Sequence, residues 1–241
     1  MVTADPRSVQ QTRPDMLFVA VIGDLVGSRQ LPGTRRGEVQ IALGRLMDRL
    51  NQEFAAGLRA KFVITLGDEF EGLVRVQAAS RTIPDLIWTI EEALPDPVSR
   101  VGIGLGGIDT PIQEDVTVLD GPAFHHAREA IGAAAKNEHL GGEFRGFGDN
   151  HDAILNGIAR VLHHQRRRWS RQQRNLAMLL HRGTRKSEAA AAMDVSRQAI
   201  SIYAQAAGWD AYEEGELAWR KALEESISGV NLSLTDLSAA P

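Results

Sequence analysis

A continuous apolar run near the start of the chain places the strongest constraint on the fold. Residues 16–22 read MLFVAVI, and the pair Gly23-Asp24 closes the run. A short apolar stretch without alternation that ends at turn residues is typical of a strand buried on both faces. The run therefore predicts a core strand that stops close to Asp24.

The segments that follow predict an α+β domain. In chain order we expect a strand at residues 16–22, a helix at 34–54, strands at 61–66 and 70–76, a helix at 83–94, a strand at 100–106 and a helix at 121–136. The order β-α-β-β-α-β is that of the ferredoxin-like unit, an antiparallel sheet covered by helices on one face, in which the first and third strands are neighbours. Asp24 and Asp68 stand at adjoining ends of those two strands, so we expect them to meet.

The second half of the chain is helical and basic. Between residues 160 and 209 the only acids are Glu188 and Asp194, whereas arginine and lysine recur throughout. We expect a nucleotide-cyclase-like α+β domain at residues 16–150 and an all-α domain at 151–227. A disordered polar leader at 1–15 and a polar tail at 228–241 complete the expected organisation.

Composition excludes several classes of protein. The chain has no cysteine, so neither a disulfide framework nor a thiolate zinc site is possible. No apolar run approaches the roughly 20 residues that a membrane-spanning helix requires, and the leader lacks the hydrophobic core of a signal peptide. These features predict a cytoplasmic protein without a membrane segment.

The clearest motif in the second half is a helix-turn-helix. Residues 187–206, SEAAAAMDVSRQAISIYAQA, have its spacing: Asp194 stands at the left-handed turn position, and Ser196 is a good N-cap for the second helix. Residues 171–209 resemble the helix-turn-helix of sigma-factor region 4 and related bacterial regulators, which implies DNA as a partner. The expected DNA contacts are Arg185, Lys186, Ser196, Arg197, Gln198, Ser201 and Gln205. The alternative is a helical hairpin that serves packing or contact with another protein.

The first half carries a second set of motifs. The segments VIGDLVGS at 21–28, TLGDEF at 65–70 and RVGIG at 100–104 together resemble the class III nucleotide cyclase domain. The segment DGPAFHHARE at 120–129 occupies the place of that family's asparagine- and arginine-bearing helix. In its exact residues the chain is more similar to the SatD family of bacterial proteins, at the segments GDLVGSR, ITLGDEFEG and DGPAFHHAREA.

The resemblance implies a metal and a nucleotide. Asp24 and Asp68 are the expected ligands of Mg²⁺, for which Mn²⁺ can substitute, because both ions take oxygen ligands and share them with phosphates. The expected nucleotide-binding residues are Gly27, Ser28, Arg29, Gly104, His125 and Arg128. Gly27 and Ser28 offer backbone N–H groups to phosphate, and Gly104 belongs to a row of alternating glycines that leaves one sheet face open to a base or ribose. Either aspartate alone is also common turn chemistry, and Glu69 is either a third ligand or an outward charge.

The departures from the cyclase pattern shape the functional expectation. Ile64 stands where that family has a base-reading lysine, His125 where it has its asparagine, and Glu129 where it has its arginine, with Arg128 displaced by one residue. Metal and phosphate features are kept, and base-reading and transition-state features are lost. We therefore expect a DNA-binding regulatory protein with a nucleotide- and Mg²⁺-binding sensor domain, acting as a homodimer. The alternatives are a nucleotide cyclase or nucleotidyl-transfer enzyme of altered chemistry, and an interaction protein built on a degenerate scaffold.

Overall fold

The computed structural model describes residues 16–94 and 98–238. The chain divides into two compact units, one made of the residues up to 157 together with those from 220 onward, and one made of residues 158–219. The expected leader, residues 1–15, lies outside the described residues. Both divisions fall inside long helices, α4 (Asp149–Arg168) and α8 (Trp209–Ser238), so the expected boundary at residue 150 precedes the observed one. Helix α8 also continues through most of the segment expected to be a polar tail.

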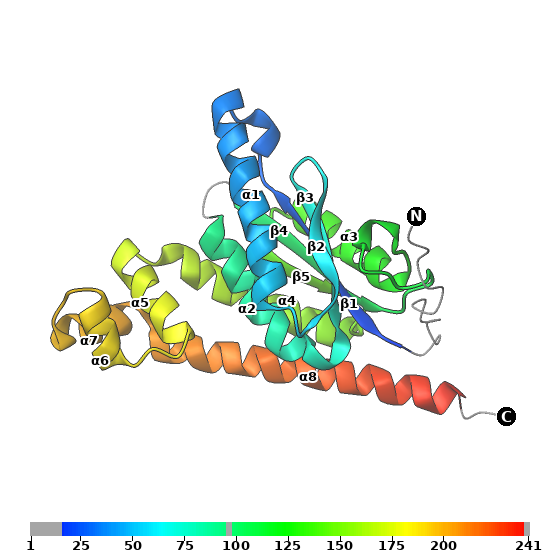
Figure 1. Ribbon diagram of the computed structural model, residues 1–241. Coiled ribbons are helices and arrows are strands. Elements are labelled where there is room, and N and C mark those ends of the chain that lie inside the picture. Colours follow the sequence, from blue (N-terminus) through cyan, green and yellow to red (C-terminus); the bar gives the residue numbers. More distant parts are fainter. Residues whose placement is uncertain (1–15, 95–97, 239–241) are drawn as a thin grey trace. The chain divides into compact units, whose positions relative to one another are not determined.

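A five-stranded sheet forms the centre of the first unit (Figure 1). Its strands are β1 (Phe18–Leu25), β2 (Leu58–Leu66), β3 (Glu69–Arg75), β4 (Ser99–Gly106) and β5 (Gly141–Arg145), in the spatial order β2-β3-β1-β4-β5. Strand β1 pairs antiparallel with both β3 and β4, as expected for the first and third strands. The short strand β5 was not expected and pairs parallel with β4. The sequence did not reveal β5 because its two glycines and its glutamate break the apolar pattern of a strand.

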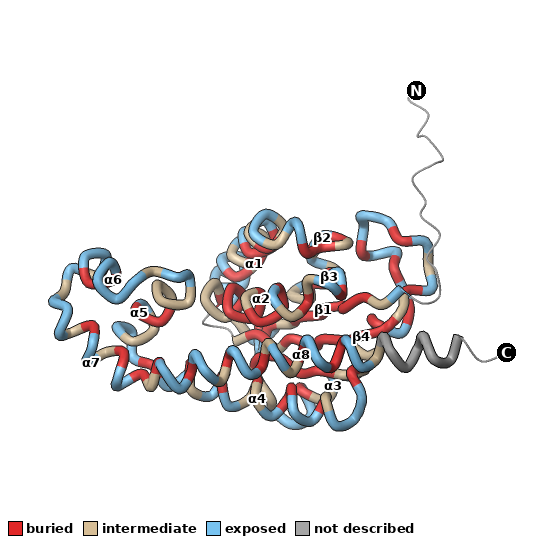
Figure 2. The backbone as a smooth tube through the Cα atoms, turned by 90° about the horizontal axis from the view of Figure 1, so that it is seen from below, coloured by how far each residue is buried: buried red, intermediate tan, exposed pale blue. Residues whose placement is uncertain are grey.

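Helices cover both faces of this sheet, so the expected covering on one face only is wrong. Helix α3 (Pro122–Lys136) packs on one face, and α1 (Gly33–Glu53) and α2 (Ala79–Ala93) lie on the other (Figure 2). The reason lies in the strands: every residue of β1 except Asp24 is buried, and a strand with two apolar faces needs a packing partner on each. On the α3 side Phe18, Ala20 and Ile22 join a core that includes Phe124 of α3.

The second unit is helical. Its elements are the last part of α4, then α5 (Arg171–His181), α6 (Lys186–Ala192), α7 (Arg197–Ala207) and the start of α8. Between α6 and α7, Asp194 has a φ of 52°, the left-handed conformation expected there. Ser196 caps α7 by accepting a hydrogen bond from the N–H of Ala199 at 3.1 Å, so α7 begins where the sequence predicts.

An aromatic cluster fixes the C-terminal end of α7 within this unit. The rings of Trp169 and Tyr212 meet edge to face with centroids 4.9 Å apart, and Trp209 stacks on Tyr212 at 5.6 Å. The indole N–H of Trp169 donates to the carbonyl of Ala207, the last residue of α7, at 2.9 Å. Because this bond satisfies a carbonyl that the helix itself leaves unpaired, the cluster holds α7 at its end as well as along its side.

Candidate functional site

An acidic cleft lies at the end of β1 in the first unit. Its volume is about 290 Å³, and both aspartates expected to bind metal line it. The full lining consists of Asp24, Leu25, Gly27, Ser28, Arg29, Gln30, Leu66, Asp68, Glu69 and Arg100. The strand register explains the meeting: β1 and β3 are paired up to Gly23 and Phe70, so the next residues along, Asp24 and the turn with Asp68, emerge at the same end of the sheet.

Each aspartate is held by a partner from another element. The guanidinium of Arg100 donates to both oxygens of Asp24, from Nε at 3.0 Å and from Nη2 at 2.7 Å. These residues face each other directly in the β1–β4 register. The hydroxyl of Ser28 donates a hydrogen bond to the carboxylate of Asp68, and so joins the loop after β1 to the β2–β3 hairpin. The two carboxylates are therefore oriented by the fold rather than free to rotate in solvent.

The loop after β1 offers backbone donors to the cleft. Gly27 has a φ of 74°, and a short turn of 3₁₀-helix follows at Ser28–Gln30. The turn's own hydrogen bonds use the N–H groups of Gln30 and Leu31. In the part of the chain that the structure describes, the N–H groups of Gly27, Ser28 and Arg29 take no part in these turn hydrogen bonds, and all three residues line the cleft.

The cleft carries ligands of the type that a hard divalent cation takes. Asp24, Asp68 and Glu69 bring carboxylate oxygens, which Mg²⁺ prefers, to its lining, but among the described residues the three do not form a converged ligand cluster. The contacts with Arg100 and Ser28 leave room for a metal, because each carboxylate oxygen has two lone pairs and the partners use only one of them. Arg29 and Arg100 add positive charge to the same walls, so the cleft can accept an anionic ligand together with a cation.

Gly104 does not belong to this site, which corrects the expectation that its sheet face is open to a base or ribose. A Cβ at Gly104 would stand 2.2 Å from the carbonyl oxygen of Ala123 and 2.3 Å from the backbone nitrogen of Ala127. Both atoms belong to α3, which covers this face. The absent side chains of Gly102, Gly104 and Gly106 let the backbone of α3 pack directly against β4.

His125 and Arg128 lie on α3 and do not line the cleft. His125 approaches Asp120 at 3.2 Å, and Arg128 approaches the buried carboxylate of Glu71 at 3.4 Å. Burial raises the pKa of Glu71, and the positive charge of Arg128 opposes that rise. These residues thus form an ionic cluster apart from the lining of the cleft, and their role in nucleotide binding stays a prediction.

The residues expected to contact DNA stand on the solvent side of the second unit. Arg197, Gln198, Ser201 and Gln205 of α7 are all exposed, whereas Ile200 on its opposite side is buried. Arg185 and Lys186 are exposed as well, but each has an acidic neighbour, Glu188 at 2.7 Å and Asp210 at 3.4 Å respectively. Surface ion pairs of this kind are weak, so they leave both cations available to a stronger anion.

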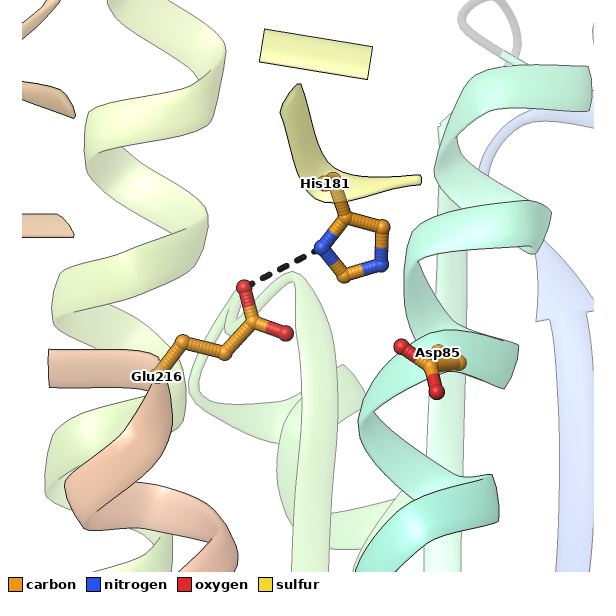
Figure 3. A group of neighbouring side chains, drawn as sticks. All are labelled: Asp85, His181 and Glu216. Atoms are coloured by element: carbon orange, nitrogen blue, oxygen red, sulfur yellow. Dashed lines mark ion pairs between the residues drawn. The ribbon is translucent and has the colours of Figure 1, made fainter. Parts of the chain in front are cut away.

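A more buried ion pair lies inside the same unit. His181 near the end of α5 approaches Glu216 of α8 at 3.4 Å, and the side chains are 15% and 8% exposed (Figure 3). The pair connects two helices of the second unit, and it is more buried than the exposed polar residues of α7.

Arg100 is the site residue that the sequence reasoning missed. It is the first residue of the RVGIG segment, in which the predicted ligand contact was assigned to a glycine. The sequence did offer a clue to Arg100. This arginine begins a predicted strand, and if that strand pairs antiparallel with β1 its start lies beside Asp24 at the end of β1. Only the exact β1–β4 register turns that possibility into a pair.

The described residues define a mixed α+β protein with a cleft lined by carboxylates and arginines in one unit and a helical second unit that is rich in arginine. Residues 18–206 match the SatD family, and the chain belongs to that family. No curated protein matches the sequence. Among solved structures, a bacterial light-regulated adenylyl cyclase is similar at a TM-score of 0.39 and 13% identity, covering 50% of this chain and 71% of the other. A second structure described in the same terms has a TM-score of 0.38 and 13% identity, covering 50% of this chain and 41% of the other. No helix among the described residues has the length and apolar character needed to cross a membrane.

Proposed function

We propose that this protein is a DNA-binding regulator whose first unit binds a nucleotide with Mg²⁺ in the acidic cleft. The observation that carries the nucleotide half is the convergence of Asp24, Asp68 and Glu69 with Arg29 and Arg100 around one opening. Phosphates and Mg²⁺ are bound together in proteins by such mixed sets of carboxylates, cations and backbone N–H groups. On this proposal the first unit is a ferredoxin-like, cyclase-like sensor domain of a cytoplasmic protein.

The DNA half of the proposal rests on α7. Its exposed polar row, Arg197, Gln198, Ser201 and Gln205, consists of side chains that reach base edges and phosphates, and α6 with its turn precedes it as in a helix-turn-helix. The second unit carries ten lysine and arginine residues against six acids, and a positive surface supplies most of the affinity for a phosphate backbone. Helix-turn-helix proteins commonly bind as dimers, so we propose a homodimer on DNA.

Nucleotide binding is tested with the full chain, each nucleoside triphosphate, and either Mg²⁺ or EDTA. We expect binding that requires the metal and weakens at least tenfold in Asp68→Asn, which keeps an acceptor for Ser28 but loses the charge. Asp48→Asn, on the exposed side of α1, is the matched control and should bind normally. Equal binding in EDTA, or an unaffected Asp68→Asn variant, would contradict the metal-assisted cleft.

An enzymatic reading shares the same cleft. Two carboxylates and a metal suit phosphoryl or nucleotidyl transfer, so the same incubations are analysed for consumed triphosphate and new products. Turnover that disappears in Asp24→Ala would favour an enzyme over a sensor. The sensor is our choice because His125 and Arg128, which stand at and beside the positions of the cyclase family's asparagine and arginine, do not line the cleft. Arg29 and Arg100 do line it, so product analysis is the measurement that separates a sensor from an enzyme in which these arginines stabilise developing charge.

DNA binding is tested by anisotropy on random and selected duplexes across a salt series. Affinity should fall with salt, with a slope near −0.9 for each phosphate contact, and Lys186→Ala should weaken binding to every sequence while flattening the slope by about one unit. Gln198→Ala should mainly relax sequence preference, because amide side chains read base edges. Absence of affinity for any duplex at low salt, with the fold intact, would assign α7 to contact with protein instead.

A further inference from the structure

A second hollow borders the acidic cleft on the side of α1. Its volume is about 350 Å³, and it lies between α1, which contributes Val39 and Gln40, and the tip of the β2–β3 hairpin. Ser28, Arg29, Leu66 and Asp68 line both the hollow and the cleft. The two spaces therefore adjoin along these four shared residues.

The hollow differs in chemistry from the cleft. Leu66, an apolar side chain beside a charged opening, is 71% exposed, and Val39 lies opposite on α1. The polar groups at its rim are fixed: Gln40 donates to the carbonyl of Gly67 at 2.8 Å, and Arg36 donates to the carbonyl of Arg29 at 2.7 Å. The hollow therefore has apolar walls and a rim of hydrogen-bonded polar groups, whereas the cleft is lined by charged side chains.

We propose that this hollow holds the base of the nucleotide whose phosphates lie in the acidic cleft. The inference rests on the proposed function, and it names the base subsite that the closed glycine face of β4 cannot provide. A nucleotide has one strongly anionic end and one flat, weakly polar end, which matches two adjoining spaces of these two kinds. Leu66 covers one face of the base, and the amide of Gln40 keeps donor and acceptor capacity for the edge of the base.

Arg29 stands where the two parts of the ligand join. It lines both spaces and is exposed, and its planar guanidinium can contact phosphate through its N–H groups and a ring through its face. The same side chain is therefore placed to serve either end of a nucleotide bound across the shared wall.

The test compares nucleoside triphosphates with inorganic tripolyphosphate, which has the phosphates and no base. In the full chain with Mg²⁺, at least one nucleoside triphosphate should bind about tenfold more tightly than tripolyphosphate. Leu66→Ser should remove that advantage, measured as the ratio of nucleoside triphosphate affinity to tripolyphosphate affinity within the same variant, because Leu66 lines both spaces. Ile41→Ser is the matched control, because Ile41 is 59% exposed on α1 and lines neither space.

The outcomes distinguish failure of the base subsite from failure of the phosphate cleft. Equal affinities for tripolyphosphate and all nucleoside triphosphates, or a full advantage retained in Leu66→Ser, would overturn the base subsite and leave the phosphate cleft standing. Binding of neither class of ligand would overturn the proposed function and this inference with it.

Discussion

The substitution Gly104→Ala distinguishes a packing role from a ligand-binding role for the glycine row of β4. If the row served a nucleotide, one methyl group would leave the fold stable and weaken binding. The structure instead places the new Cβ 2.2 Å from the carbonyl oxygen of Ala123 and 2.3 Å from the nitrogen of Ala127. The contact is with backbone, so no side-chain rotation relieves it, and α3 must move away from the sheet.

The expected cost follows from the packing of α3. Overpacking a close-packed interior typically costs 1–3 kcal/mol, and a clash with helix backbone belongs at the upper end, about 3 kcal/mol. For a chain of this size each kcal/mol lowers the melting temperature by roughly 2–4 °C. Gly104→Ala should therefore unfold roughly 6–12 °C below the wild type.

The assay is thermal and urea unfolding, with Gly132→Ala as the matched variant. Gly132 is an exposed glycine of α3 with no atom within 4 Å of its added Cβ. That substitution should stabilise the chain by about 0.5–1 kcal/mol, because glycine in a helix interior costs that much relative to alanine. A Gly104→Ala variant that melts within a degree or two of the wild type would refute the assignment of this face to α3.

Three further predictions concern stability and metal. Burial raises the pKa of Glu71, so the stabilising contribution of this group is complete below its ordinary pKa and is lost as the pH rises through the raised pKa. The melting temperature of Glu71→Gln should therefore climb relative to that of the wild type from acidic to neutral pH. A difference in melting temperature that does not change with pH would contradict the burial argument. Ser196→Ala should cost about 1 kcal/mol in urea unfolding through loss of the α7 cap, and no loss would show that the cap is dispensable. Arg100→Ala should raise Mg²⁺ affinity in the absence of nucleotide, measured by calorimetry, because it removes a positive charge that lies 2.7 Å from Asp24 and repels a cation there. Weaker Mg²⁺ binding would mean that Arg100 orients the carboxylate for the metal.

The sequence predicted the elements of the fold better than their arrangement. Apolar periodicity located the strands and helices of the first unit within a few residues, because the buried positions of β1 and of one side of α1 carry apolar residues. The apolar run of β1 indicates burial on both faces, but the packing of α3 on one of those faces could not be identified in this way. It depends on glycines whose function in packing is invisible until the partner helix is placed, and the row at Gly102, Gly104 and Gly106 looks the same whether a ligand or a helix lies above it.

The candidate site was predictable to the extent that it depends on strand order. Placing β1 beside β3 is sufficient to bring Asp24 and Asp68 to one end of the sheet, and the order of elements suggests that neighbourhood. Register is a different matter. The pairing of Asp24 with Arg100 changes with a shift of a single residue, and no local pattern fixes it, because a strand position is chosen by the whole sheet.

Regulation of DNA binding by a nucleotide requires a fixed quantitative relation between the affinities of the chain for its two ligands. A nucleotide can alter DNA binding only if it has different affinities for the DNA-competent and DNA-incompetent states, and the coupling must then be reciprocal. If saturating nucleotide changes the affinity for a selected duplex tenfold, saturating duplex must change nucleotide affinity by the same factor, about 1.4 kcal/mol. Helices α4 and α8 each contribute residues to both units, so the covalent route for such coupling exists. Measuring both affinities with and without the other ligand decides the matter: equal ratios different from one support a nucleotide-responsive regulator, whereas two ratios of one mean that the units bind their ligands independently.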